Sequence, residues 1–435
     1  MESALTRRCS SQPVTSIVLA DELLESIRTP SGEPELLRWN RGNASYRREF
    51  QIEKNNYVAA DSDFGLPHEI TLARKPQDYG SDEVLVNEIA EILRARSGVS
   101  GSDAEFAAFC AVATHFADCH DPALRAVISA TDEWEAARFL QLLACFCRHA
   151  FPVAAFDPGL LWTLPLGCVP TFLSCDPEPS DKVITLLNAT QHRGFALARV
   201  GQTFSRPFSA IIIDCHGMAP TSFGRIDATP RTQPVISNTE DLTAIEERFQ
   251  AKLLSYRLRN QHLIASSARD TAPLGGCVRA MAFALGSCFP KNPVLQARIS
   301  ELLQPHDEER RFDSACGEAA IVLEALLVLC HQNRNDAHVG DVAEVANGIL
   351  ELRGEGYQLD PRRVGALLKP FRLGHTRDSR GYKFLLSAAN QRKIHELARS
   401  REVSFFKSEI KPCNFCRDSA LSIEVPNTSA GRSQL

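Results

Sequence analysis

The chain of 435 residues lacks several patterns that would assign it to a common enzyme class. It contains no GxSxG, HExxH or GxGxxG motif, which argues against a serine-hydrolase elbow, a helical zinc-protease site and a dinucleotide-binding turn. No apolar run approaches the roughly 20 residues of a membrane-spanning helix, so no membrane partner is expected. The N-terminus has a four-residue apolar core, Ile17–Ala20, and is not expected to be a signal peptide.

Disulfide bonds are not expected either, although the chain contains 14 cysteines. Most of them stand singly within apolar segments, as Cys110, Cys288 and Cys330 do. Such cysteines are typical of small buried side chains in a reducing compartment. These observations predict a helix-rich cytoplasmic protein.

Strands alternate with helices in the middle of the chain. Apolar strands are expected at 126–128, 170–174 and 209–214, and a helix with Ser81 as its cap is expected at 81–96. The continuous apolar run at 209–214 is typical of a parallel strand that is buried on both faces. The alternation therefore predicts an α/β fold with a parallel sheet covered by helices.

The turn after the first of these strands lacks what a phosphate-binding loop requires. The pattern GxxxxGK[ST] supplies glycines for close backbone approach, a lysine for the phosphates and a hydroxyl for Mg²⁺. In this chain other residues take those places, namely Ala130, Glu135, Ala136 and Ala137. The acids at 132, 133 and 135 would also repel a triphosphate. The segment is either no nucleotide site or one that has lost its chemistry.

The C-terminal part of the chain is basic, although the net charge of the whole is −5. Between Pro361 and Pro412 there are 13 lysines and arginines against four acids, which gives +9 and leaves −14 elsewhere. Such asymmetry favours a polyanionic partner for this part of the chain.

The basic part has the outline of a winged helix. A helix at 339–352 is followed by a second helix that begins after Asp360, and then by a hairpin whose turn lies between Thr376 and Tyr382. In such a unit, basic side chains of the second helix and the hairpin reach a DNA groove and its phosphates. The candidates are Arg362, Arg363, Lys369, Arg377, Arg380 and Lys383. The alternative is a solvated basic face that contacts protein.

The order of these parts resembles the AAA+ ATPase module of bacterial and phage helicase- or primase-associated proteins. The stretches that carry the resemblance are PTFLSCDPEPSDK (170–182), LLNATQHRGF (186–195), SAIIIDCHG (209–217) and ERFQAKLLSYRLRN (247–260). The resemblance covers about 110–400. With the patterns above, it implies a degenerate AAA+-like α/β core at 81–235, a helical lid or bundle at 236–335 and a basic, winged-helix-like domain at 336–412. A poorly specified region at 1–80 and a tail at 413–435 flank them.

The resemblance also implies roles for particular residues. Asp176 would match an acid of the Walker-B strand, which holds Mg²⁺ and polarises water, and Asp214 would end the sensor strand. Arg225 and Arg231 lie where an arginine finger falls. Because the lysine and the Mg²⁺-binding hydroxyl are missing, hydrolysis would lose both main sources of charge stabilisation. We therefore expect neither ATP nor Mg²⁺ as a cofactor and no enzymatic activity.

The sequence thus favours a non-hydrolysing AAA+-like component of mobile-element or phage-type DNA transactions, which binds DNA or assembles with itself or other proteins. An active ATPase with an unorthodox loop and a helical protein-interaction scaffold remain alternatives. Cys413 and Cys416 form a CxxC pair, which could be half of a zinc site completed by a distant pair or by a second subunit.

Overall fold

The computed structural model describes residues 11–19, 22–53, 55–61, 66–67, 70–119, 121, 123–154, 159, 170–176, 180–189, 197–199, 202–204, 208–213, 224–233, 239–264, 274, 276–332, 334–379, 381–401, 403 and 415. The chain divides into two compact units, residues 1–307 and 308–435. Each unit is described by itself.

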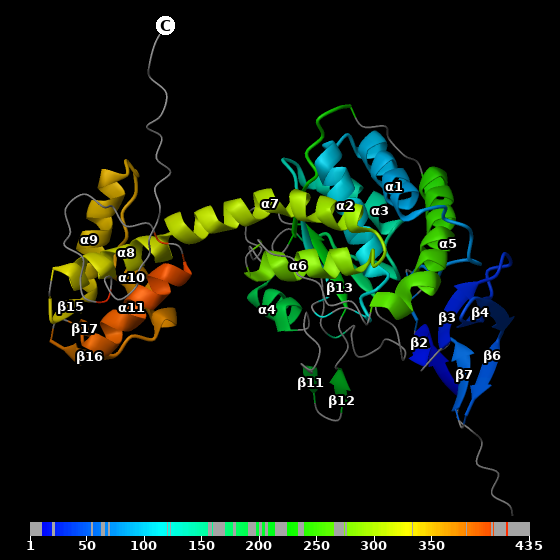
Figure 1. Ribbon diagram of the computed structural model, residues 1–435, viewed down its shortest axis with the longest axis horizontal. Helices are drawn as coiled ribbons and strands as arrows, with labels where there is room; N and C mark the ends of the chain where they lie inside the picture. Colours follow the sequence, from blue (N-terminus) through cyan, green and yellow to red (C-terminus); the bar gives the residue numbers. More distant parts are fainter. Residues whose placement is uncertain are drawn as a thin grey trace, which may run out of the picture. The chain divides into compact units, whose positions relative to one another are not determined.

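The first unit begins with short β-strands (Figure 1). An antiparallel meander contains β2 (Ser16–Leu19), β3 (Glu22–Arg28), β4 (Pro34–Asn40) and β5 (Asn43–Arg47). A second sheet, in the order β1-β7-β6, contains β1 (Ser11–Val14), β6 (Glu49–Ile52) and β7 (Asn55–Ala59). The sequence did not predict these strands, because they are short and the buried polar pair Glu25 and Ser26 interrupts the apolar pattern of β3.

A five-stranded parallel sheet forms the centre of the first unit. Its strands are β8 (Arg125–Ser129), β9 (Ala150–Val153), β10 (Thr171–Ser174), β13 (Ser209–Ile213) and β14 (Gly224–Asp227), in the order β14-β8-β13-β10-β9. Every neighbouring pair is parallel. The expected α/β fold with a parallel sheet is confirmed.

Helices cover both faces of this sheet, because alternate side chains of each strand point to opposite faces. One face, with Ile211 and Ile213, shares a core with six helices. They are α1 (Asp82–Ser97), α2 (Gly101–Thr114), α3 (Glu133–Ala144), α5 (Thr239–Ile264), α6 (Gly276–Ser287) and α7 (Pro293–Cys316). The other face, with Ala210 and Ile212, packs against α4 (Asp181–Ala189). The chain also forms the small hairpin of β11 (Leu197–Arg199) and β12 (Gln202–Phe204).

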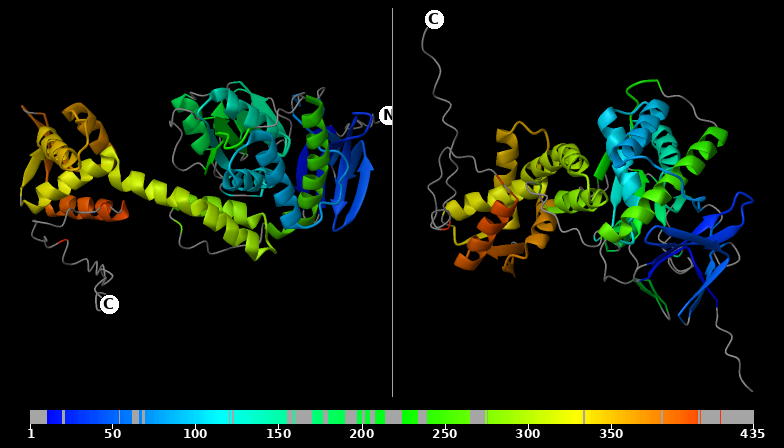
Figure 2. Two further views of the ribbon diagram at one scale, coloured as in Figure 1. Left: turned by 90° about the horizontal axis from the view of Figure 1, so that it is seen from above. Right: turned by 45° about the vertical axis from the view of Figure 1, so that its right-hand side comes forward.

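The helices after residue 236, where the sequence predicts a helical lid or bundle, contribute to the cores of both units. Buried residues of α5, α6 and the first part of α7 belong to the main core of the first unit. One face of α5 also packs against β3 and β4 through Leu254 and Leu258, and both views of Figure 2 show it beside these strands.

The described residues of the second unit form a three-stranded antiparallel sheet and four α-helices after α7. In chain order these are α8 (Glu318–His331), β15 (Asp336–His338), α9 (Val339–Leu352), α10 (Pro361–Leu368), β16 (His375–Asp378), β17 (Gly381–Leu385) and α11 (Ala388–Ser400). The sheet order is β15-β17-β16. The predicted hairpin is confirmed, and so is the cap of α10 by Asp360. Helix α8, expected in the lid, packs instead into the core of this unit, because its apolar face meets α9 and α11.

Candidate functional site

The connection between β8 and α3 stands where a nucleotide loop would lie. It contains only three residues, Ala130, Thr131 and Asp132. Because β8 lies between β13 and β14, the connection follows the carboxyl end of a central strand, where open α/β sheets bind their ligands. Three residues offer too few backbone N–H groups to surround a phosphate.

The N-terminus of α3 is already occupied by the chain's own carboxylate. Oδ1 of Asp132 accepts a hydrogen bond from the backbone N–H of Trp134 at 2.7 Å, and Glu133 and Glu135 lie in the first turn. These acids complement the helix dipole, so the helix end that binds phosphate in a P-loop is neutralised here. A triphosphate would meet negative charge instead of open N–H donors.

Three of the four residues at the expected nucleotide-loop positions lie in a helix. Glu135, Ala136 and Ala137 lie within α3 and not in a loop, because Asp132 starts the helix earlier than the motif requires. Ala136 is completely buried and Ala137 packs against the same core. A lysine at position 136 would point into the core, whereas position 137 is only partly buried.

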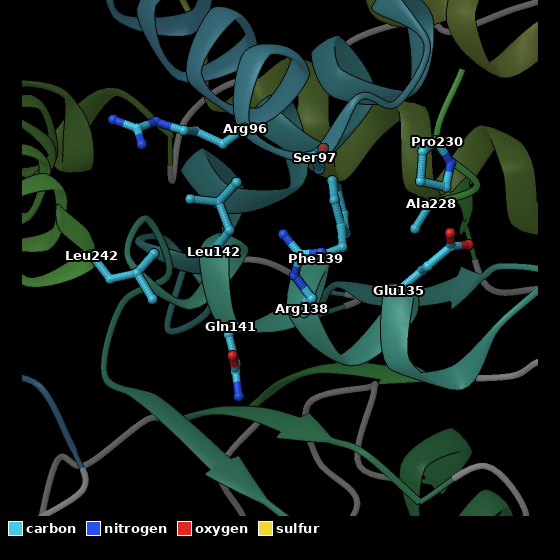
Figure 3. A pocket seen from close by; sticks show the side chains of 10 residues that line it. All are labelled: Arg96, Ser97, Glu135, Arg138, Phe139, Gln141, Leu142, Ala228, Pro230 and Leu242. Atoms are coloured by element: carbon cyan, nitrogen blue, oxygen red, sulfur yellow. The ribbon is translucent and has the colours of Figure 1, made fainter. Parts of the chain in front are cut away.

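A small hollow lies beside α3, and Figure 3 shows the side chains around it. Glu135, Arg138 and Gln141 of α3 line it together with Arg96 of α1. Its volume is about 70 Å³, whereas small-molecule sites usually measure about 300–1,000 Å³. It is too small to enclose a nucleotide.

The residues that resemble catalytic groups are only partly brought together. Asp176 follows β10, and its N–H donates to Oγ of Ser174 at 3.3 Å. Strand β13 separates β10 from β8, and Asp214, which follows β13, lies outside the described residues. Arg231 pairs with Asp227 at 2.7 Å, which ties its guanidinium to the last residue of β14.

Exposed basic side chains of the second unit lie at α10 and on the β16–β17 hairpin. Arg362 and Lys369 are exposed at α10, and Arg377 is exposed on β16. The guanidinium of Arg377 lies 5.6 Å from the ring centre of Tyr382, which is 51% exposed. In the part of the chain that the structure describes, no carboxylate forms an ion pair with Arg362, Lys369 or Arg377.

Two of the predicted DNA contacts have acidic partners. Nε of Arg363 donates to Glu318 at 2.7 Å, and Nζ of Lys383 lies 2.7 Å from Asp336. Both acids are distant in sequence, so the charge pattern alone could not reveal the pairs. Arg380, Cys413 and Cys416 lie outside the described residues.

Tyr382 is a candidate contact that the sequence interpretation missed. Its ring lies next to the guanidinium group of Arg377, which belongs to the same hairpin. It therefore offers an exposed aromatic surface beside a cation. Aromatic residues interleaved with basic ones in the hairpin were the available signal.

A larger hollow of about 890 Å³ lies between the N-terminal strands and the end of α5. Trp39, Arg41, Asp118, Arg259 and His262 are among its lining residues. Its walls carry charges of both signs, so its chemistry does not select one class of ligand.

Comparisons with known proteins do not show a family for this chain. No protein-family model and no curated protein matches it. It is similar to the apo C-terminal region of NrS-1 (residues 305–718), at 10% identity over 83% of this chain and 96% of that one, with a TM-score of 0.30. It is also similar to a chain in the structure of Drosophila ORC bound to DNA, at 14% identity over 76% and 96%, with a TM-score of 0.19. Likenesses this low carry no argument about function. Among the described residues, no helix is long and apolar enough to cross a membrane.

Proposed function

We propose that this chain is an AAA+-like protein that does not hydrolyse ATP and binds DNA through its second unit, as a component of mobile-element or phage-type DNA transactions. The observation that carries the DNA-binding part is the exposure of Arg362, Lys369 and Arg377 on one helix and one hairpin. Exposed cations of this kind supply the phosphate contacts that dominate DNA affinity.

The arrangement of the second unit supports a winged helix. A helix, a short strand, two helices and a hairpin follow one another, and the first strand pairs with the last in the order β15-β17-β16. In helix–turn–helix proteins the second helix of the motif enters the major groove. Here that helix is α10, which buries Val364 and Leu368 and exposes Arg362.

The strand order of the first unit supports an AAA+-like core. The strand before the loop position, β8, is adjacent to the sensor-like strand β13, and β13 is adjacent to the Walker-B-like strand β10. In a nucleotide-hydrolysing module these three carboxyl ends would bring the loop, the sensor and the acid to one edge. The chain keeps that order of strands.

The loss of hydrolysis rests on the connection between β8 and α3. Without a loop that surrounds phosphates, and with Asp132 on the helix end, neither binding nor charge stabilisation of a transferring phosphoryl group is available. An AAA+ fold without this chemistry would serve for assembly.

Nucleotide binding and turnover separate this proposal from an active ATPase. We expect titration calorimetry with millimolar Mg·ATP to show no binding, and we expect the full chain and Asp176→Ala to have the same background ATPase rate with or without DNA. Micromolar affinity with turnover that is lost in Asp176→Ala would instead establish an active ATPase.

The protein-interaction scaffold is tested by the affinity for DNA. We expect the full chain to bind duplex DNA with an affinity that falls steeply as salt rises, because bound phosphates release counterions. A chain without any salt-dependent affinity for duplex or single-stranded DNA would be the scaffold.

A further inference from the structure

An exposed aromatic ring lies near the turn of the hairpin that β16 and β17 form. Tyr382 and Phe384 of β17 project from the same face of the strand, because alternate residues of a strand share a face. Phe384 is buried in the core of the second unit, whereas Tyr382, which is nearer the turn, is 51% exposed. The core therefore ends between these two residues, and the ring of Tyr382 extends beyond it into solvent.

The neighbouring strand places a cation and an imidazole against this ring. Arg377 of β16 lies directly opposite Tyr382 in the antiparallel register, and its guanidinium lies over the ring at 5.6 Å from the ring centre. The ring of His375 meets the same ring edge to face, with ring centres 5.3 Å apart and ring planes at 72°. An exposed aromatic ring beside an arginine can stack on a base and place positive charge next to the adjacent phosphate.

Side chains outside the hairpin hold both of its ends in place. At its base, Nδ2 of Asn390 in α11 donates to the backbone oxygens of Gly374 and Leu385, at 3.0 and 2.7 Å. Near its turn, Nε2 of His338 lies 2.9 Å from Oδ2 of Asp378. Because the hairpin is supported in this way, the free energy of stacking is not offset by the ordering of a loose loop.

Such a ring distinguishes unpaired bases from the interior of a duplex. Within a duplex both faces of each base pair are covered by the neighbouring pairs, so an aromatic side chain has no base face to stack on unless a base leaves the stack. Unpaired bases expose a face at no such cost. Because every base has a π-face, this contact does not depend on the DNA sequence.

We propose that Tyr382 stacks on an unpaired base, so that the second unit binds DNA best where a duplex joins a single strand. This inference rests on the DNA binding proposed above and names the form of DNA that the site selects. Arg377 supplies positive charge for a phosphate next to the stacked base. The exposed cations of α10, Arg362 and Lys369, supply the contacts to phosphates of the duplex.

Two tailed duplexes of equal length and charge test this proposal on the full chain. Each carries a short single-stranded tail, made of thymidines in one duplex and of abasic sugars in the other, which keep the phosphates and lack the bases. We expect fluorescence anisotropy to show about tenfold tighter binding of the thymidine tail, because stacking on a single base contributes affinity of this order. Tyr382→Ala should lose this preference and keep the affinity for the abasic tail, which also reports that the variant is folded. Tyr382→Phe should keep the preference, because the ring and not the hydroxyl stacks on the base.

The matched control is Tyr357→Ala, which removes another exposed tyrosine of the second unit. Tyr357 is 43% exposed and lies outside the hairpin, so this variant should keep the preference for the thymidine tail. Equal affinity of the wild-type chain for both tails would overturn the inference and leave duplex binding in place. A preference that survives in Tyr382→Ala would also overturn it. If neither DNA binds with salt-dependent affinity, the proposed DNA binding itself is contradicted.

Discussion

Arg257 of α5 forms a buried ion pair with Asp118, which follows α2, and its Nη1 donates to Oδ1 at 2.8 Å. Arg257 is 0% exposed. A second buried pair lies beside it, in which Nη2 of Arg148 donates to Glu25 at 2.7 Å. Because Glu25 belongs to β3, these four side chains join the N-terminal strands to the core of the first unit. Burial alone would raise the pKa of Asp118, but Arg257 and Arg148 hold it well below its ordinary value.

Removing one carboxylate of this network should destabilise the first unit strongly. Asp118→Asn leaves two buried guanidinium groups with Glu25 as their remaining carboxylate, and breaking a buried pair costs about 3–5 kcal/mol. Chemical denaturation of the full chain measures the loss. The matched control is Asp78→Asn. It removes the exposed carboxylate that pairs with Arg259, which lies in α5 like Arg257, and it should change the unfolding midpoint little. Equal small effects of both variants would contradict a structural role for the network.

Acid should weaken the fold through His115. Its ring is buried, and burial lowers its pKa to about 3, while Nε2 stays bonded to the backbone oxygen of Phe146 at 3.0 Å. Between about pH 3 and 6.5 the unfolded chain therefore binds a proton that the folded chain does not, so stability falls as the pH drops through this window. The melting temperature of the wild-type chain should decrease from pH 7 to pH 4 more steeply than that of His115→Gln. Parallel curves would show that His115 does not carry the effect.

The cap of α3 should matter for stability and not for nucleotides. Asp132→Ala removes the side-chain acceptor for Trp134 N–H and should cost about 1 kcal/mol. Asp132→Ser keeps an acceptor and should cost less, because serine also caps helices well. Thermal unfolding of both variants gives the comparison. A gain of ATP binding in either variant would mean that the carboxylate alone blocks an otherwise complete site.

DNA affinity should depend on Arg362 and Lys369 more than on Arg363. Each lost phosphate contact should weaken binding to all sequences and reduce the salt slope by about one unit. Arg363 already pairs with Glu318, so Arg363→Ala should have the smaller effect although it lies on the same helix. Arg94→Ala in α1 is an exposed cation outside the second unit and serves as a further control. Fluorescence anisotropy at several salt concentrations measures the DNA affinity of each alanine variant. An equal loss of affinity in the variants of Arg362, Lys369, Arg363 and Arg94 would refute this ranking.

Gly98 should not tolerate a side chain. It ends α1 with φ +73°, and a Cβ there would overlap the backbone oxygen of Thr232. The left-handed conformation alone costs a residue with a Cβ about 1–2 kcal/mol. Because the clash with Thr232 adds to this cost, Gly98→Ala should destabilise the fold by more than this amount and lower the melting temperature accordingly. Gly101→Ala is the control, because nothing lies within 4 Å of its added Cβ. Similar melting temperatures for both variants would contradict the close approach.

The sequence predicted the elements whose signals are local. The cap at Ser81, the apolar strand that begins at Ser209 and the hairpin with its turn between Thr376 and Tyr382 need only neighbouring residues, and the structure confirms them. Other features depend on residues that are far apart in the chain. They are the N-terminal strands, the packing of α8 in the second unit and the ion pair of Arg363 with Glu318. Asp132 shows the same limit at the candidate site, because counting along a motif could not reveal that the helix begins directly after this residue.

DNA binding measured with and without Mg·ATP tests the central claim most directly. Anisotropy titrations of duplex DNA with the full chain, at low and moderate salt, should give an affinity that falls as salt rises and is the same with millimolar Mg·ATP as without nucleotide. The variant Arg362→Ala/Lys369→Ala/Arg377→Ala should lose most of this affinity under both conditions. Binding that appears only with Mg·ATP, or that persists unchanged in the triple variant, would contradict a nucleotide-independent DNA-binding protein.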